Sequence, residues 1–112
     1  MGDNQVITTL ETAVSGASHA SQILTQGAKL WSILCGTDGT TDFQIMMYNG
    51  DANTKPQLIP KTPIDASVYG FNGVVFTKPK EFPDGVYLEV QAVGGGAFGG
   101  DCEITIDYEK AF

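Results

Sequence analysis

The chain has 112 residues, and its thirteen carboxylates outnumber its six basic residues, all lysine, to give a formal net charge of -7. Because nucleic-acid binding needs cations that neutralise phosphates, and anionic membranes repel acidic proteins, this balance argues against both kinds of partner. The length suits one domain around one core, and 42% hydrophobic residues argue against disorder.

Short stretches of alternating apolar residues, separated by glycine and proline, run through the chain and are typical of β-strands. The first predicted strand covers residues 5–11. Residues 11–26 carry a partial helical stripe, but a glycine and several serine and threonine residues weaken it. We therefore predict a loop and a short strand in that second segment.

The middle of the chain contains three further predicted strands. Residues 28–35 are apolar nearly throughout, which predicts a strand covered on both faces. Residues 42–49 alternate, and a hairpin turn of the Asp-Gly type at residues 37–40 connects the two strands. Three prolines within residues 51–66 leave room only for a short edge strand near residues 57–59.

The last third of the chain shows the clearest β patterns. Residues 67–77 resume the β pattern, and residues 78–84, with two prolines, predict a surface loop. Residues 85–93 and 102–108 alternate between apolar and polar side chains and predict a terminal hairpin. Seven or eight short strands without a convincing helix predict a single-domain, all-β, antiparallel β-sandwich of jelly-roll-like type over residues 1–112.

Residue types that carry catalysis or bind metals are sparse. The single histidine, His19, has no neighbouring carboxylate or cysteine in the sequence, whereas a nucleophilic triad needs a base and a group that orients it. Cys35 and Cys102 fall at inward positions of predicted strands, so we expect buried free thiols, with an inter-sheet disulfide as the alternative. The glycine-rich residues 93–100 lack the lysine of a phosphate loop. We therefore predict a protein without enzymatic activity, cofactor or metal.

No apolar run reaches the roughly 18 residues that would span a bilayer. The start, Met1-Gly2-Asp3-Asn4, lacks the basic residues that open a signal peptide. We therefore expect the chain to be made in a cytoplasm.

Three stretches together carry a family resemblance: residues 46–50 close a strand at a turn, residues 82–90 open a strand, and residues 104–108 form the last one. This layout resembles the small β-sandwich decoration or cement proteins of tailed bacteriophage capsids. The resemblance implies a non-enzymatic virion protein, made in the host cytoplasm, that is often trimeric. Such a protein binds the major capsid protein and stabilises the head shell.

The first predicted strand also bears on assembly. Val6, Ile7 and Leu10 are distributed over both of its faces. The segment is therefore either the domain's own first strand or part of an N-terminal arm, residues 1–12, that adds to a neighbour's sheet edge. The low charged fraction, 17%, is typical of surfaces that meet partners. We predict a homotrimer whose partner interface includes these three residues and Phe98 of the glycine-rich loop.

An alternative function is a module of a phage head fibre or tail appendage that binds carbohydrate or a receptor. Exposed aromatic side chains on loops would favour it, and Tyr69, Phe71 and Phe98 are the candidates. A small enzyme of the cupin or lyase type is a third reading, disfavoured by the single histidine and the lack of arginine.

Overall fold

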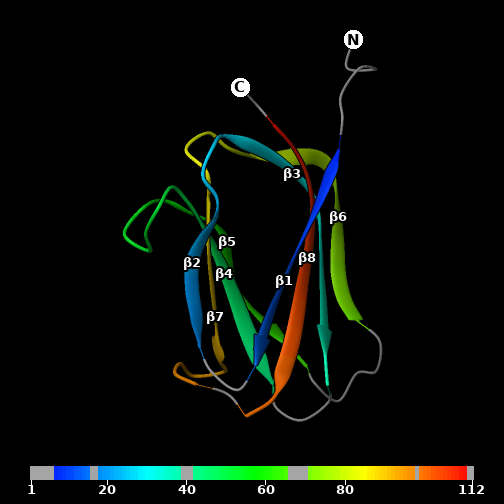
Figure 1. Cartoon of the computed structure of the whole chain (residues 1–112), viewed down its shortest axis with the longest axis vertical. Coiled ribbons are helices and arrows are strands. Elements are labelled where there is room, and N and C mark those ends of the chain that lie inside the picture. Colours follow the sequence, from blue (N-terminus) through cyan, green and yellow to red (C-terminus); the bar gives the residue numbers. More distant parts are fainter. Residues whose placement is uncertain (1–6, 16–17, 39–41, 66–70, 98, 111–112) are drawn as a thin grey trace.

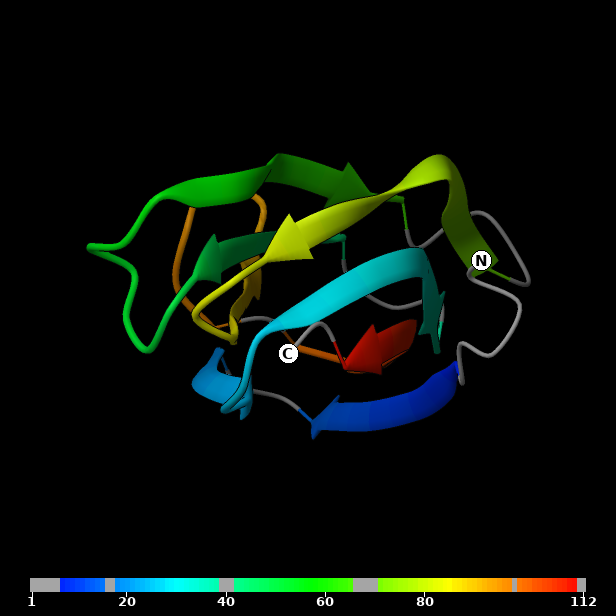
Figure 2. The same cartoon turned by 90° about the horizontal axis from the view of Figure 1, so that it is seen from above.

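A computed structural model describes residues 7–15, 18–38, 42–65, 71–97 and 99–110, with the backbone alone for residues 71 and 72. These residues form no helix and eight strands: β1 (Thr8–Ser15), β2 (His19–Leu24), β3 (Ala28–Thr37), β4 (Phe43–Asn49), β5 (Gln57–Ile64), β6 (Phe71–Phe82), β7 (Val86–Ala92) and β8 (Asp101–Lys110). The strands build two stacked four-stranded sheets, in the orders β1-β8-β3-β6 and β2-β7-β4-β5 (Figures 1 and 2). The predicted all-β sandwich is confirmed.

The pairing of the strands is that of a ribbon folded over on itself. β4 pairs with β5, β3 with β6, β2 with β7 and β1 with β8, all antiparallel. This is the jelly-roll arrangement of eight strands. Among the described strands, only β4 and β5 are consecutive members of one sheet.

Both predicted hairpins, around residues 37–40 and between the last two strands, are therefore wrong. β3 and β4 belong to different sheets, as do β7 and β8, so each connection crosses the sandwich. Alternation identifies which face of a strand is buried, but it carries no information about which sheet the strand joins.

The hydrophobic core lies between the two sheets and takes residues from both. Its largest fully buried side chains include Phe43, Phe82, Leu30, Met47 and Leu88. Burying one such side chain contributes about 1.5–3 kcal/mol. The alternation predicted for the last two strands is confirmed, because the apolar positions of β7 and β8 point into this core.

β3 is covered on one face only, contrary to the prediction from its apolar sequence. Leu30 and Ile33 lie in the core, whereas Leu34 is 37% exposed. A bulge between Leu30 and Ser32 shifts the register of the strand, so inward residues on its two sides are three positions apart. The same bulge takes Trp31 out of the inward row.

Three other segments differ from the sequence prediction. One is β5, which runs over Gln57–Ile64 instead of ending near residue 59. Residues 11–26 contain the predicted short strand as β2, but residues 11–15 belong to β1 instead of a loop. β6 continues through the predicted surface loop as far as Phe82, because Phe82 is fully buried and pairs with Ala28. Its Pro79 is tolerated because β6 is an edge strand.

Candidate interaction surface

The two long sides of the sandwich are formed by different pairs of edge strands. Viewed from above, β1 and β2, in blue, lie along one side, and β5 and β6, in green and yellow, lie along the other (Figure 2). A cavity of about 480 Å³ opens between β5 and β6, and its lining includes Ile45, Leu58, Ile64 and Phe76. We call this the open side; Leu58 and Phe76 in its lining are partly exposed, whereas Ile45 and Ile64 are buried.

Apolar surface continues from this cavity, which Val74 lines, around the edge strand β6 to its outer face. Val74 is 47% exposed and Val75 is 79% exposed. Leu34 lies beside them, because it pairs with Gly73 on the neighbouring strand. We define Leu34, Val74 and Val75 as the β6 patch; exposed apolar clusters of this kind mark protein-binding surfaces.

Charge is distributed unequally between the two sides. Lys61 on β5 and Lys78 and Lys80 on β6 are exposed, and Lys80 also lines the cavity; the exposed acidic residue on β6 is Glu81, near its end. On β1 and β8 the exposed charged residues include Glu11 and Glu103. An apolar surface with cations at its rim attracts an acidic partner and repels a basic one.

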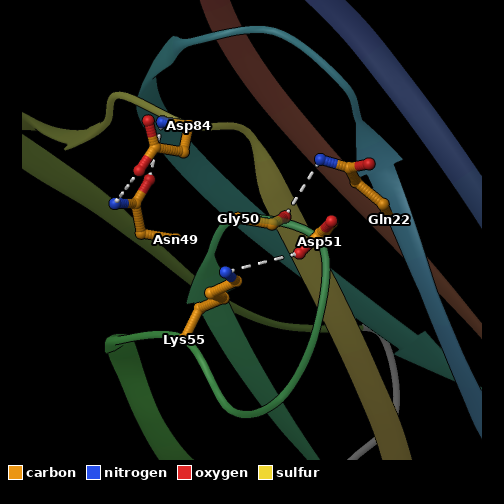
Figure 3. Close-up of polar contacts among 6 residues, drawn as sticks. All are labelled: Gln22, Asn49, Gly50, Asp51, Lys55 and Asp84. Atoms are coloured by element: carbon orange, nitrogen blue, oxygen red, sulfur yellow. Dashed lines mark hydrogen bonds and ion pairs between the residues drawn. The ribbon is translucent and has the colours of Figure 1, made fainter.

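Polar contacts hold together the end of the sandwich at which β4 ends, at Asn49 (Figure 3). Asn49 Nδ2 donates to Asp84 Oδ2 over 3.3 Å, and the backbone N–H of Asp84 donates to Asn49 Oδ1 over 2.8 Å. Gln22 Nε2 on β2 donates to the carbonyl oxygen of Gly50 over 3.0 Å. We call Asn49, Gly50, Asp84 and Gly85 the turn junction.

Backbone geometry at the turn junction requires glycine. Gly85 has φ +108°, and a Cβ there would lie 2.4 Å from the carbonyl oxygen of Leu24. The ion pair between Lys55 and Asp51, with 4.0 Å between Nζ and Oδ1, spans the loop that follows Gly50 (Figure 3). Two of the stretches that carry the family resemblance, residues 46–50 and 82–90, therefore meet here, where their shared turn chemistry has a structural role.

The outer face of β4 and β7 holds a second polar cluster. Gln44 Nε2 donates to Gln91 Oε1 over 3.1 Å, and Asn53 Nδ2 donates to Glu89 Oε2 over 3.2 Å. Burial, followed by a hydrogen bond to Glu89, raises the pKa of Tyr48 above its usual value. Because Gln44 and Glu89 are buried and satisfied by neighbours within the chain, this cluster is an internal network that holds the sheet together.

The residues predicted for the partner interface do not form one described patch. Ile7 is 50% exposed and precedes the end of β1 that pairs with Tyr108. Leu10 is partly buried against the core. The glycine-rich loop leads into Asp101, at the opposite end of β1. Val6 and Phe98 lie outside the described residues.

The β6 patch was missed by sequence reasoning. Val74 and Val75 fall within a predicted strand, but their exposure depends on the position of that strand at a sheet edge. Leu34 falls in a strand that was expected to be covered on both faces. The one available signal is that Val74 and Val75 are adjacent, so one of them must face away from the core in a strand.

The two cysteines are buried, and the histidine lies within hydrogen-bond distance of a neighbouring side chain. Cys35 and Cys102 are free and buried, as predicted, and burial is the main cause that raises the pKa of each thiol to about 12. His19 Nε2 lies 2.9 Å from the hydroxyl of Ser21. Within the described ranges, no three histidine, cysteine, aspartate or glutamate side chains gather as a metal would need.

The described residues contain no helix that is long and apolar enough to cross a membrane. No protein-family model matches the chain, and a comparison with curated proteins gives no match.

Proposed function

We propose that this chain is a non-enzymatic structural protein of a tailed-phage virion that decorates the head shell by binding the major capsid protein. The observation that carries the proposal is the open side, where a cavity of about 480 Å³ and the β6 patch leave apolar surface uncovered. Uncovered apolar surface of this kind indicates a protein partner.

The remaining properties of the chain agree with a structural role. Polar groups in the turn junction and in the β4–β7 cluster are used within the fold. A jelly roll presents rigid edges and faces, which suits a component that must fit a repeating shell. The family resemblance adds the expectation of a homotrimer, made in the host cytoplasm and then bound to the virion.

The proposal is tested on intact particles made by the phage whose genome encodes the chain. Quantitative mass spectrometry of purified particles should find the chain in a fixed ratio to the major capsid protein. Particles from which the DNA has been released should retain that ratio. Absence of the chain from purified particles would refute the proposal.

The carbohydrate-binding alternative rests on Tyr69, Phe71 and Phe98, whose side chains lie outside those described. It stays a prediction. A glycan array probed with the purified chain tests it, and strong binding to one class of glycan would favour a fibre or tail-appendage module over a shell component.

A further inference from the structure

The edges of the two sheets are protected to different degrees. β5 carries Pro60, Lys61 and Pro63, which interrupt pairing along its outer edge. β2 is short, six residues, and its pairing has a bulge between Gln22 and Leu24. Both edges of the sheet formed by β2, β7, β4 and β5 therefore resist the addition of another strand.

In the described part of the chain, both edges of the other sheet lack these protecting features. β1 pairs with β8 along all eight of its residues without a bulge, and it contains neither proline nor lysine. The first half of β6, residues 71–77, likewise lacks proline and charge, and it carries exposed Val74 and Val75. Lysines and Pro79 occur only in the second half of β6. An unprotected apolar edge invites pairing with a further strand.

We infer that the partner of the β6 edge is a second copy of this chain, whose β1 adds to β6 and extends the sheet from one subunit to the next. The inference rests on the proposed function in that both assign protein binding to the open side. The neighbouring copy would take the edge of β6 and cover Val74, and Leu34 and Val75 on the outer face would remain for the capsid protein. Because one subunit uses β6 and its neighbour uses β1, the contact is head to tail and repeats until a ring closes.

Strand direction favours this pairing. β1 is antiparallel to β8, β8 to β3, and β3 to β6, so β1 and β6 of one copy run in opposite directions. A rotation about an axis along the strands leaves strand direction unchanged. The β1 of the next copy therefore reaches β6 antiparallel, in the orientation that gives perpendicular hydrogen bonds between strands.

Side-chain direction and charge also favour the pairing of β1 of one copy with β6 of the next. Val74 pairs with the core residue Ile33 and so faces inward. On β1 the inward face carries Thr12 and Val14, whose partners Ile104 and Cys102 are buried. Adding β1 to β6 would cover the exposed half of Val74 with inward residues of the neighbour and bring the acidic β1 side toward the lysines of β6.

A symmetric pairing of β1 with β1 is disfavoured by charge. Glu11 lies near the middle of the eight-residue strand, so an antiparallel pair of two β1 strands would place two carboxylates side by side. A symmetric pairing of β6 with β6 would leave β1 uncovered. The experiment below separates that arrangement from the head-to-tail one.

The test uses two lysine substitutions that point inward from the two edges, Val74→Lys on β6 and Thr12→Lys on β1. Mass is measured by light scattering after size exclusion, without capsids. The wild-type chain should form a closed oligomer whose mass is a multiple of 11.9 kDa. Each variant alone should be monomeric, and an equimolar mixture should give a heterodimer and nothing larger, since one intact β6 edge and one intact β1 edge remain.

A matched control keeps the result interpretable. Val93→Lys changes an equally apolar residue, 53% exposed, outside both edges, and should assemble like the wild type. If Val74→Lys or Thr12→Lys loses its circular dichroism spectrum of a folded chain, the exposed substitutions Val75→Lys and Ala13→Lys replace them. A monomeric wild-type chain, or assembly of the β1 variant on its own, would overturn the inference. Neither result bears on whether the chain is present in virions.

Discussion

The turn junction and the open side show two opposite uses of the same kind of fold. At the turn junction, Asn49 and Asp84 satisfy each other's hydrogen bonds and Gly85 adopts a backbone conformation that fits against Leu24. At the open side, Val74 and Val75 contribute apolar surface that the described part of the chain leaves uncovered. The comparison indicates that the junction stabilises the fold of the chain itself, whereas the open side is the surface for which we propose a protein partner.

The largest expected effect on the free energy of unfolding comes from a substitution in the closed core, compared with one at the open side. Phe82 is 0% exposed and Val75 is 79% exposed, although both belong to β6. Phe82→Ala should lower the free energy of unfolding by about 3–5 kcal/mol because it leaves a cavity. Val75→Ala should change it by about 0.5 kcal/mol or less in the monomer. Urea denaturation at low protein concentration checks both, and similar losses for the two variants would contradict the comparison.

The next effect concerns glycine geometry. Gly85→Ala combines a positive φ with a Cβ placed 2.4 Å from a backbone oxygen, and should cost about 2–4 kcal/mol. Gly95→Ala is the matched control, because its φ is +100° but nothing lies within 4 Å of the added Cβ. We expect a loss of about 1 kcal/mol there. Equal losses in chemical denaturation would show that contact with Leu24 contributes nothing.

A smaller effect tests the polar half of the turn junction. Asn49→Ala removes both contacts with Asp84, whereas Asp84→Ala keeps the backbone N–H and so loses only the 3.3 Å contact. Hydrogen bonds of this kind contribute about 0.5–1.5 kcal/mol each. Asn49→Ala should therefore shift the denaturation midpoint further than Asp84→Ala. The reverse order would mean that the Asp84 carboxylate has another role.

The smallest effect at neutral pH concerns the two thiols. Their pKa is about 12 in the folded chain against 9.0 for an unperturbed thiol. The thiol pKa is higher in the folded chain than in the unfolded chain, so the contribution of each buried thiol to the stability of the fold is full below pH 9. It is lost as the pH rises from about 9 to about 12, because the unfolded chain releases the thiol proton first. The free energy of unfolding should fall less steeply over that range in a Cys35→Ala variant than in the wild type.

The same burial controls thiol reactivity. A thiol reagent near neutral pH should label neither cysteine until the chain is denatured, because the thiolate is the reactive species. Rapid labelling of the native chain would show that the strands around Cys35 and Cys102 open readily. Failure to label after denaturation without reductant would indicate a disulfide.

Local pattern was enough to predict the fold class but not the topology. Alternation in residues 85–93 and 102–108 identified two strands and their buried faces correctly. It could not assign those strands to different sheets, because sheet membership depends on partners far away in the sequence. The bulge at Trp31 was equally invisible, since it is defined by pairing with β6 and β8.

The candidate surface depends on the same long-range information. Val74 and Val75 look like ordinary strand residues, and only the place of β6 at the sheet edge leaves them exposed. The prediction of Ile7 and Leu10 as interface residues rests on their distribution, with Val6, over both faces of the first predicted strand. The structure places Leu10 against the core, because β1 pairs with β8 of the same chain.

The pairing of β1 with β8 also sets the order in which the chain can fold. Thr9 and Asp107, which share a hydrogen bond, are 98 residues apart, so β1 leaves the ribosome long before its partner exists. The β4–β5 hairpin has its partner within a few residues, and closing that short loop costs much less chain entropy. We therefore expect slow folding that proceeds outward from this hairpin, with the β1–β8 pair closing last. Pulsed hydrogen exchange during refolding should protect amides of β4 before those of β1, and simultaneous protection would show that the sandwich closes in one step.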